Sequence, residues 1–450
     1  MQSPAPVNPP RADSRMREDW NRRAREDAYY YVAFGKHGQD DTEFHDTAHE
    51  IVYGLEYELR RLPRDAGPGS LRALEIGCGP GRLMKPLSRH FAEIHGVDVS
   101  DEMVQLARER LHGTPNAHVH TGQGSDLRQF DDESFDFVYS YAVFQHIPSR
   151  EIVESYWAEA RRVLKTGGLF WFQVNGLPAD DLPVNTWSGV RYEAREIAAF
   201  ANRNDFQMYT LEGVNTQYMW TSLRKRPRGW FTELAARPPE TSARIRRISN
   251  PHGTEPGVPC AGRFSVASLW IENPHPECGL NHLRVFIDGV KGTPNYIAPV
   301  LNNGQQQFNV VLPAGVATGL IPVRMEWLGR QVGDEAIVRI VPPSPCVPRL
   351  LSVSDATDLL SGPRILTRSI KAVMEELADP ADARFSLNGI PLSPSIIHWA
   401  DRRTPRVEFV LPLPESIPSG AAVFQVEARR QKFPAITLDV VLEGMAQGPY

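Results

Sequence analysis

Hydrophobic and polar positions change their spacing several times along the chain. Apolar residues recur every three or four positions over residues 16–31 and 43–61, a spacing that predicts two amphipathic helices. From residue 71 to residue 226, short apolar runs alternate with helical segments, which is the pattern of an α/β sheet. We therefore predict N-terminal helices followed by a seven-stranded α/β sheet, which together form one domain over residues 16–226.

The second half of the chain carries a different pattern. Residues 227–255 are rich in arginine and lack a clear period, so we predict a linker there. From residue 256 onward, short apolar and β-branched runs are separated by Gly, Pro and Asn, and helical patterns nearly vanish. This combination is typical of all-β sandwich domains.

An internal repeat divides this all-β half in two. Residues 307–326 align without a gap with residues 408–427. We predict two tandem sandwiches, over residues 256–343 and 347–445, that fold independently of each other and of the first domain. Both resemble bacterial immunoglobulin-like modules, a class that often serves for interaction or spacing.

The composition narrows the classes of function. The chain has 49 basic and 54 acidic side chains, and this near balance gives no reason to expect nucleic acid or an anionic membrane as a partner. No apolar run reaches the length of a membrane span. Residues 1–15 are rich in proline, lack the apolar core of a signal peptide and are predicted to be disordered. We therefore expect a cytoplasmic protein.

The four cysteines lie far apart in the sequence, without a CxxC pair or a neighbouring histidine cluster. We therefore expect neither a metal site nor a disulfide framework. Cys260 and Cys278 could pair in an exported protein, whereas buried thiols fit a cytoplasmic one.

A glycine-rich turn is the first candidate for binding chemistry. Residues 71–76 form an apolar, strand-like run that leads directly to Gly77, Gly79 and Gly81, and a helical segment follows. Glycines at alternate positions let the backbone turn sharply and approach a ligand closely. The third glycine stands one residue earlier than in the GxGxxG motif of dinucleotide enzymes, which favours a single nucleoside.

An acidic residue ends the next strand. Asp98 lies roughly twenty residues beyond the glycines, where a carboxylate can accept hydrogen bonds from a ribose diol. The glycine turn, Asp98 and four later blocks resemble, in the same order, the class I S-adenosylmethionine-dependent methyltransferases of the type 11/12/25 group. These blocks are residues 121–127, 134–140, 144–148 and 162–170. The resemblance implies a Rossmann-like fold, S-adenosyl-L-methionine as cofactor, and N-terminal helices that close over it.

The resemblance also implies which residues bind the cofactor. Met103 stands where family members place a side chain beside the adenine. Gln123 replaces an acid with which relatives accept a hydrogen bond from the adenine amino group, and its amide oxygen can accept the same bond. The full set carried over is Glu75, Gly77, Cys78, Gly79, Gly81, Asp98, Val99, Met103, Gln123, Gly124 and Ser140.

His146 is the candidate for catalysis. It follows the central strand of the predicted sheet, and in open α/β sheets ligands bind at the carboxyl ends of the strands. An imidazole titrates near neutral pH, so His146 could take a proton from a hydroxyl acceptor, or it could only pack and orient the loop. The residues expected to face the acceptor are Tyr141, Gln145, Trp187, Arg191 and Tyr192.

Three functions are compatible with these patterns. The leading one is O-methylation of a hydroxyl on a small molecule or a glycan, with the sandwiches serving acceptor recruitment or homo-oligomerisation. The alternatives are N-methylation of a small amine, and a binding or scaffold protein with a vestigial nucleotide fold. The three glycines and Asp98 are all present at the expected spacing, which argues against a vestigial fold. The acceptor, the methylated atom and the oligomeric state stay open at this point.

Overall fold

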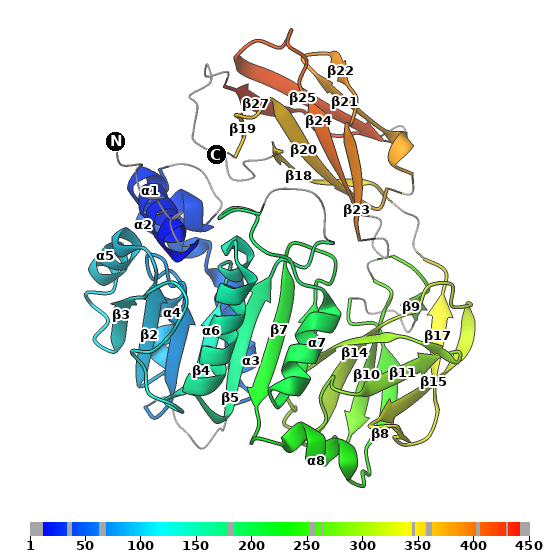
Figure 1. Cartoon of the computed structure of the whole chain (residues 1–450). Helices are drawn as coiled ribbons and strands as arrows, with labels where there is room; N and C mark the ends of the chain where they lie inside the picture. Colours follow the sequence, from blue (N-terminus) through cyan, green and yellow to red (C-terminus); the bar gives the residue numbers. More distant parts are fainter. Residues whose placement is uncertain are drawn as a thin grey trace, which may run out of the picture.

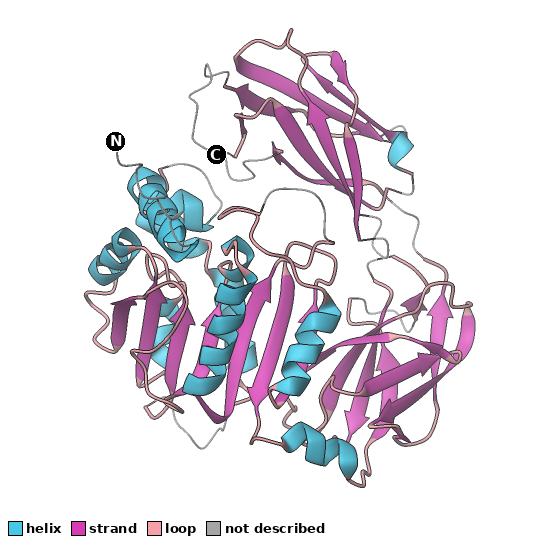
Figure 2. Ribbon diagram, in the orientation of Figure 1, coloured by secondary structure: helices cyan, strands magenta, loops and turns pink. Residues whose placement is uncertain are grey.

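An α/β sheet and two strand-rich units make up the chain, as the computed structural model shows (Figure 1 and Figure 2). The residues that it describes are 12–33, 38–62, 69–178, 184–252, 257–262, 264–343, 347–356, 362–377, 379–401, 406–428 and 431–441. In these ranges, no helix has the length and apolar character needed to cross a bilayer.

Seven strands form the N-terminal part of the largest sheet. They are β1 (Arg72–Ile76), β2 (Glu93–Asp98), β3 (Ala117–Thr121), β4 (Phe135–Ser140), β5 (Leu164–Val174), β6 (Phe206–Glu212) and β7 (Met219–Lys225). Their order is β3-β2-β1-β4-β5-β7-β6, and β7 alone runs antiparallel to its neighbours β5 and β6. The predicted seven-stranded, Rossmann-like α/β sheet is confirmed.

Helices cover both faces of this sheet, which is why its central strand is apolar almost throughout. Phe137, Val138 and Tyr139 of β4 are fully buried. Figure 1 shows α6 and α7 across one face. The helical segments between β1 and β6 are α4 (Met84–Leu87), η1 (Ser88–His90), α5 (Asp101–Arg110), η2 (Phe144–His146), α6 (Arg150–Val163) and α7 (Ala194–Arg203).

Three helices precede the sheet: α1 (Ala12–Ala33), α2 (Asp41–Asp46) and α3 (His49–Leu59). α1 is interrupted at Asp27, whose φ and ψ of −169° and 85° are extended. The single helix predicted for residues 43–61 is divided into α2 and α3. Of residues 1–15, expected to be disordered, residues 1–11 lie outside the described part, and the others already belong to α1.

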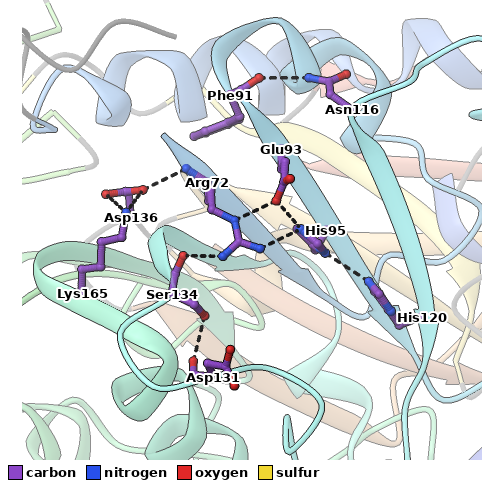
Figure 3. Close-up of polar contacts among 10 residues, drawn as sticks. All are labelled: Arg72, Phe91, Glu93, His95, Asn116, His120, Asp131, Ser134, Asp136 and Lys165. Atoms are coloured by element: carbon purple, nitrogen blue, oxygen red, sulfur yellow. Dashed lines mark hydrogen bonds and ion pairs between the residues drawn. The ribbon is translucent and has the colours of Figure 1, made fainter. Parts of the chain in front are cut away.

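A polar network ties together the amino ends of the parallel strands (Figure 3). The Arg72 guanidinium donates to Glu93 Oε2 at 2.9 Å and to the Ser134 carbonyl at 3.1 Å, which links the starts of β1, β2 and β4. Asp136 accepts from the Arg72 amide at 2.8 Å and from Lys165 Nζ at 2.9 Å. These bonds close the amino edge of the sheet, and the candidate site lies at the opposite, carboxyl edge.

The first strand-rich unit begins earlier than we expected. Residues 227–255, predicted as a linker, contain helix α8 (Trp230–Ala236) and strand β8 (Arg244–Ser249), so that prediction is corrected. Ile245 and Ile248 of β8 pack against the core while its arginines stay exposed, and its backbone pairs with β10. The other strands of this unit are β9 (Val258–Pro259), β10 (Val266–Glu272), β11 (Leu283–Ile287), β12 (Val290–Lys291), β13 (Thr293–Ile297), β14 (Gln306–Val311), β15 (Gly319–Trp327), β16 (Arg330–Gln331) and β17 (Ala336–Val341).

The second unit repeats the topology of the first. The order β13-β14-β10-β8 matches β23-β24-β20-β18, and β12-β11-β15-β17-β9 matches β22-β21-β25-β27-β19. The sequence repeat therefore has a counterpart in strand order, while the likeness to immunoglobulin-like modules stays a prediction. The elements of this unit are β18 (Arg349–Asp355), β19 (Arg364–Ile365), β20 (Ser369–Glu375), η3 (Pro380–Asp382), β21 (Ala383–Leu387), β22 (Ile390–Leu392), β23 (Ile396–Asp401), β24 (Arg406–Pro412), β25 (Gly420–Ala428), β26 (Gln431–Lys432) and β27 (Ile436–Val440).

The two units differ in how they join the rest of the chain. Tyr296 of β13 pairs with Thr210 of β6, so the first unit extends the N-terminal sheet into an 11-stranded one. One hydrophobic core runs through both parts. The second unit has a separate core, in which the rings of Phe385 and Phe409 lie 4.8 Å apart. The shared core argues against the expected independent folding of the first unit.

The cysteines that the structure describes, Cys78, Cys260 and Cys278, carry free thiols. Burial raises the pKa of Cys278 to about 12, so this thiol stays protonated at neutral pH. Within the described ranges, no three side chains among His, Cys, Asp and Glu are grouped in a way that could hold a metal ion.

Candidate functional site

The glycine turn lies at the carboxyl end of β1. Gly77, Gly79 and Gly81 have φ angles of 73°, 50° and 77°, in the left-handed region that glycine adopts without strain. A Cβ on Gly77 would lie 2.4 Å from Val143 Cγ2, so a larger residue does not fit there. The Gly77 amide donates to the Val97 carbonyl at 2.7 Å, which fixes the turn against β2.

Asp98 ends β2 beside this turn. Its two carboxylate oxygens accept from the Gly79 amide and the Ser100 amide, each at 2.9 Å. Burial raises the pKa of Asp98, and the bonds from these amides counteract the shift by stabilising the charged form. The Ser100 hydroxyl caps α5 by accepting from the Met103 amide at 3.1 Å. Asp98 therefore holds the turn and the start of α5 in one fixed geometry.

A cavity lies between the glycine turn, Asp98, α1 and the segment that follows β4. Its lining residues are Trp20, Tyr31, Val32, Glu75, Gly77, Cys78, Gly79, Arg82, Leu83, Asp98, Met103, Tyr141, Ala142, Val143, His146 and Ile147. The cavity thus sits at the carboxyl ends of β1, β2 and β4, where open α/β sheets bind their ligands.

Glu75 contributes a buried carboxyl group to this lining. Only 3% of the residue is exposed, and Tyr139 Oη donates to its Oε2 at 2.9 Å. Burial raises the pKa of Glu75 to about 8, although the Tyr139 bond and the Arg82 charge act in the opposite direction. At neutral pH the carboxyl group is therefore largely protonated. A cationic ligand group beside it would favour the charged form.

His146 lies in η2 and uses both of its ring nitrogens. Nδ1 donates to the Trp187 carbonyl at 2.9 Å, which leaves Nε2 to accept from Gln145 Nε2 at 3.1 Å. Gln173 in turn donates to Gln145 Oε1. Burial lowers the pKa of His146 to about 4, and the charge of Arg23 adds to the shift. The imidazole is therefore neutral at physiological pH, and its lone pair already accepts a hydrogen bond.

α1 and the loop around Trp187 close one side of the cavity. The Arg23 guanidinium lies 4.8 Å from the ring centre of Trp20 and 4.9 Å from that of Trp187. It also donates to the Thr186 carbonyl at 3.3 Å and to the Thr186 hydroxyl at 3.1 Å. A guanidinium between two aromatic faces, with hydrogen bonds at its edge, fixes α1 to this loop. The ring of His146 lies 5.7 Å from each of the two tryptophan rings.

The structure brings part of the predicted cofactor set to the cavity: Glu75, Gly77, Cys78, Gly79, Asp98 and Met103. Ser140 instead donates its hydroxyl to the Ile76 carbonyl at 3.0 Å, and Gly81 packs against Leu111. Gln123, expected beside the adenine, is exposed to solvent. The predicted residues outside the lining are Gly81, Val99, Gln123, Gly124 and Ser140.

Tyr141, one of the residues expected to face the acceptor, lines the cavity, as does His146, the candidate for catalysis. The Tyr141 ring stacks on Trp220 with centres 5.7 Å apart, which fixes its orientation. Gln145 is buried beside the His146 ring and bonds to it. Trp187 covers the same ring from the loop.

Arg191 and Tyr192 do not reach the cavity, contrary to our expectation. The Arg191 guanidinium donates to the Pro178 carbonyl at 2.7 Å. Tyr192 is buried, with its ring 4.8 Å from that of Trp157 and the Arg150 guanidinium 4.5 Å from its centre. The Tyr192 contacts fix the loop to α6, and the Arg191 bond joins two parts of the loop itself.

Sequence reasoning missed several lining residues. Trp20 lay on the apolar stripe of a helix that we expected to close over the cofactor, but nothing in the sequence linked it to a loop more than 160 positions away. Arg82 had a clearer signal, because it is a charged residue directly after a turn that is otherwise apolar. The other lining residues outside the predictions are Tyr31, Val32, Leu83, Ala142, Val143 and Ile147.

One known protein family matches the part of the chain that contains this site. Residues 74–172 match the model of a family described as a methyltransferase domain. The match begins within β1 and ends within β5, so it contains the glycine turn, Asp98 and the segment after β4.

Curated relatives share this region and differ in their chemistry. Phosphoethanolamine N-methyltransferase 2 of Caenorhabditis elegans is 28% identical over 208 residues, which cover 42% of this chain and 47% of the relative. Cyclopropane-fatty-acyl-phospholipid synthase of Escherichia coli K12 is 27% identical over 216 residues, covering 45% and 52%. A ubiquinone biosynthesis O-methyltransferase of Mesorhizobium japonicum is 29% identical over 114 residues, covering 25% and 44%. The chain thus spans about half the length of the curated relatives it matches.

Solved structures give a distant likeness. Magnesium protoporphyrin IX methyltransferase from Synechocystis, with bound S-adenosylmethionine, is 16% identical with a TM-score of 0.36 and covers 50% of this chain and all of its own. Phosphoethanolamine N-methyltransferase 1 of Haemonchus contortus, in complex with phosphoethanolamine and S-adenosylhomocysteine, is 14% identical with a TM-score of 0.36, covering 48% and 50%.

Proposed function

Residues 74–172 belong to the methyltransferase domain family, whose members use S-adenosyl-L-methionine, and on this premise we propose that the chain methylates a hydroxyl group of a small molecule or a glycan. One observation carries the proposal. A single cavity joins the glycine turn and Asp98, which suit a nucleoside, to Tyr141 and His146 at the carboxyl edge of the sheet. We propose both the class of acceptor, a small molecule or a glycan, and the methylated atom, a hydroxyl oxygen.

The residues of the cavity fit the cofactor. Gly77 and Gly79 line the cavity, and a backbone without a Cβ can approach a ligand closely. Asp98 would accept from the ribose hydroxyls, and Met103 would lie against the adenine. S-adenosylmethionine supplies a methyl carbon activated by its sulfonium. The protein then has to hold an acceptor oxygen in line with that carbon.

Positioning is the role that the geometry of His146 supports. Its Nε2 lone pair accepts from Gln145, and its Nδ1 is bonded to the loop that carries Trp187. A base with a pKa of about 4 would be a weak proton acceptor for a hydroxyl. We therefore assign to His146 the orientation of the segment that carries Tyr141, and the acceptor proton leaves through water.

The charges around the cavity favour a hydroxyl over an amine. Arg23 and Arg82 are buried beside it, and the carboxyl group of Glu75 is largely protonated at neutral pH. In the protein without its cofactor, this positive surrounding disfavours a protonated amine in the cavity. The alternative of a scaffold with a vestigial fold is disfavoured because Asp98 and Gly79 keep their mutual hydrogen bond at 2.9 Å.

Mass spectrometry of reaction products tests the proposal. The full chain is incubated with methyl-labelled S-adenosylmethionine and matched panels of hydroxyl and amine compounds, including glycans. We expect label in an oxygen-linked methyl group and formation of S-adenosylhomocysteine. The Asp98→Ala variant should lose both. Label in amine products alone would replace the hydroxyl by the amine hypothesis, and a chain that binds no S-adenosylmethionine would leave only the scaffold.

A further inference from the structure

Arg82 brings a buried positive charge to the wall of the cavity. The residue is 5% exposed, and its guanidinium lies 5.4 Å from the ring centre of Tyr141 and 5.9 Å from that of Phe44. One nitrogen, Nη1, donates to Thr47 Oγ1 at 3.0 Å. Nε is buried and has no hydrogen-bond partner among the described residues. Buried donors are normally bonded, and because Arg82 lines the cavity, this nitrogen is placed to donate to a ligand there.

The charge of Arg82 also lacks a carboxylate partner in the part of the chain that the structure describes. Glu75 is the acid that interacts with it electrostatically, but burial raises the pKa of Glu75 to about 8 and leaves it largely neutral. Asp98 already accepts two backbone amides. Buried arginines are usually paired with an anion, because an uncompensated buried charge is costly. The charge of Arg82 therefore favours the binding of a negatively charged ligand group in the cavity.

We infer that Arg82 binds the α-carboxylate of the methionine part of S-adenosylmethionine. The inference rests on the proposed function and assigns a residue to the amino-acid end of its cofactor. Asp98 and Met103 mark the nucleoside end of the cavity, whereas Glu75 and Arg82 flank the glycine turn in the sequence. The amino-acid end is a zwitterion, and Arg82 is the cationic side chain in the described lining, since His146 is neutral.

The geometry of an arginine suits this ligand. A guanidinium presents Nε and a terminal nitrogen along one edge, and this edge matches the two oxygens of a carboxylate. The bond to Thr47 holds the guanidinium by Nη1. The stacked Tyr141 ring limits its movement further. An acidic acceptor has the same chemistry, but Arg82 directly follows the glycine turn and shares its wall with Glu75, which favours the cofactor.

Calorimetry with two cofactor analogues tests the inference. The probes are S-adenosylmethionine and decarboxylated S-adenosylmethionine, which keeps the sulfonium and the amine and lacks only the carboxylate. We expect Arg82→Met to lower the affinity for S-adenosylmethionine about 10-fold or more and to leave that for the decarboxylated analogue within about twofold. Arg82→Lys, which keeps the charge without the planar edge, should lie in between.

A matched control separates this effect from the loss of any buried arginine. Arg110 is also largely buried, with an unpartnered Nε, but it pairs with Asp41 outside the cavity lining. Arg110→Met should leave the ratio of the two affinities unchanged. Thermal unfolding of each variant shows that it is folded, and Arg82→Lys serves for the comparison if Arg82→Met is not.

Three results would overturn the inference. Wild-type protein could bind both analogues equally, or Arg82→Met could weaken both to the same degree. Arg82→Met could also leave both affinities unchanged and raise only the KM for the acceptor, which would transfer Arg82 to an acidic acceptor. If the wild-type chain bound neither analogue, the proposed function itself would fail, and that outcome differs from the other three.

Discussion

Burial decides what His146 can contribute as a single residue. An efficient general base has a pKa near the working pH, whereas burial and the nearby Arg23 charge lower the pKa of His146 to about 4. Both ring nitrogens are bonded, one to Gln145 and one to the backbone of Trp187. The side chain is thus better placed to hold a loop than to move a proton.

We predict that His146→Ala lowers kcat by less than about 100-fold, below the usual scale for a lost general base. The profile of kcat between pH 6 and pH 9 should keep its wild-type shape, because a group with a pKa of about 4 does not titrate there. His146→Asn, which can donate and accept, should recover part of the activity. A loss well above 100-fold with a changed pH profile would make His146 the base after all.

The raised pKa of Glu75 predicts that the protein releases a proton when it binds the cofactor. Burial raises its folded pKa from the ordinary value of 4.5 to about 8, so the free protein carries the protonated form below that pH. A sulfonium or ammonium beside Glu75 lowers this pKa and releases the proton. Calorimetry of S-adenosylmethionine binding at pH 7, in two buffers of different ionisation enthalpy, should detect proton release, and affinity should rise from pH 6 to pH 8.

The Glu75→Gln variant is the control for this linkage. It keeps the shape of the side chain and the acceptor for the Tyr139 hydroxyl, but it cannot release a proton. We expect its affinity for S-adenosylmethionine to be independent of pH over the same range. Equal proton release in the variant and in the wild type would assign the proton to another group.

The site residues that could be identified from the sequence are those whose role depends on their neighbours in the chain. Gly77 and Asp98 could be predicted because turn geometry and the end of a strand are properties of neighbouring residues. The clamp of Arg23 on Thr186 joins positions 163 residues apart, and no local pattern encodes it. Gln123 was placed by motif position, yet its loop points it to solvent.

At the scale of elements, histidines join the edge strand β3 to the sheet. His95 of β2 stacks on His120 of β3 with ring centres 5.3 Å apart, and their nitrogens Nδ1 and Nε2 lie 3.1 Å apart. Burial, together with the positive charges around it, lowers the pKa of His95 to about 4, although Glu93 acts in the opposite direction. Burial lowers the pKa of His120 as well.

These shifts predict a loss of stability in acid. Above about pH 6.5, His95 is neutral in the folded and the unfolded protein, and the folded state keeps its full stability. As the pH falls from 6.5 toward 4, the unfolded protein binds a proton at His95 more readily than the folded protein does, so stability is lost. Partial solvation of the ring reduces the effect to about 2 kcal/mol in the free energy of unfolding. Denaturant unfolding at pH 7 and at pH 4.5 measures it.

The comparison of variants isolates His95 from other titrating groups. His95→Gln should be less stable than wild type at pH 7 and should lose less stability on acidification. His112→Gln, at an exposed position, should follow the wild-type pH dependence. Identical pH dependence in the wild type and His95→Gln would refute the role of this residue.

Element boundaries were predictable where a period or a cap marked them. Ser100 as the cap of α5 and the strands β6 and β7 follow from local sequence. The linker prediction for residues 227–255 missed β8, because its exposed arginines obscure Ile245 and Ile248. Those two residues become an inward face only when β10 is present as a partner.

At the scale of the whole molecule, the N-terminal sheet and the first strand-rich unit form one body (Figure 1). The Asn281 side chain donates to the Phe206 carbonyl at 3.0 Å and accepts from the Met208 amide at 2.7 Å, so it completes the backbone bonds of β6. Buried Gln207 donates to the Cys278 carbonyl at 2.8 Å. These contacts are specific and lie far from the cavity, so the first unit stabilises the fold that presents the site.

Truncation distinguishes the two units. A chain ending at residue 343 keeps the continuous core and should bind S-adenosylmethionine with unchanged affinity and nearly unchanged Tm, because the second unit has its own core. A chain ending at residue 250 leaves Gln207 and the edge of β6 without partners, and we expect it to be insoluble or to lose much of its Tm. Thermal unfolding and calorimetry on both chains measure this. A stable, cofactor-binding chain ending at residue 250 would show that the shared core is dispensable.

The same truncation tests the role of the second unit. If the chain ending at residue 343 binds the cofactor but no longer methylates an acceptor that the full chain uses, the second unit recruits the acceptor. If light scattering instead shows that it loses a dimer, the second unit assembles the oligomer.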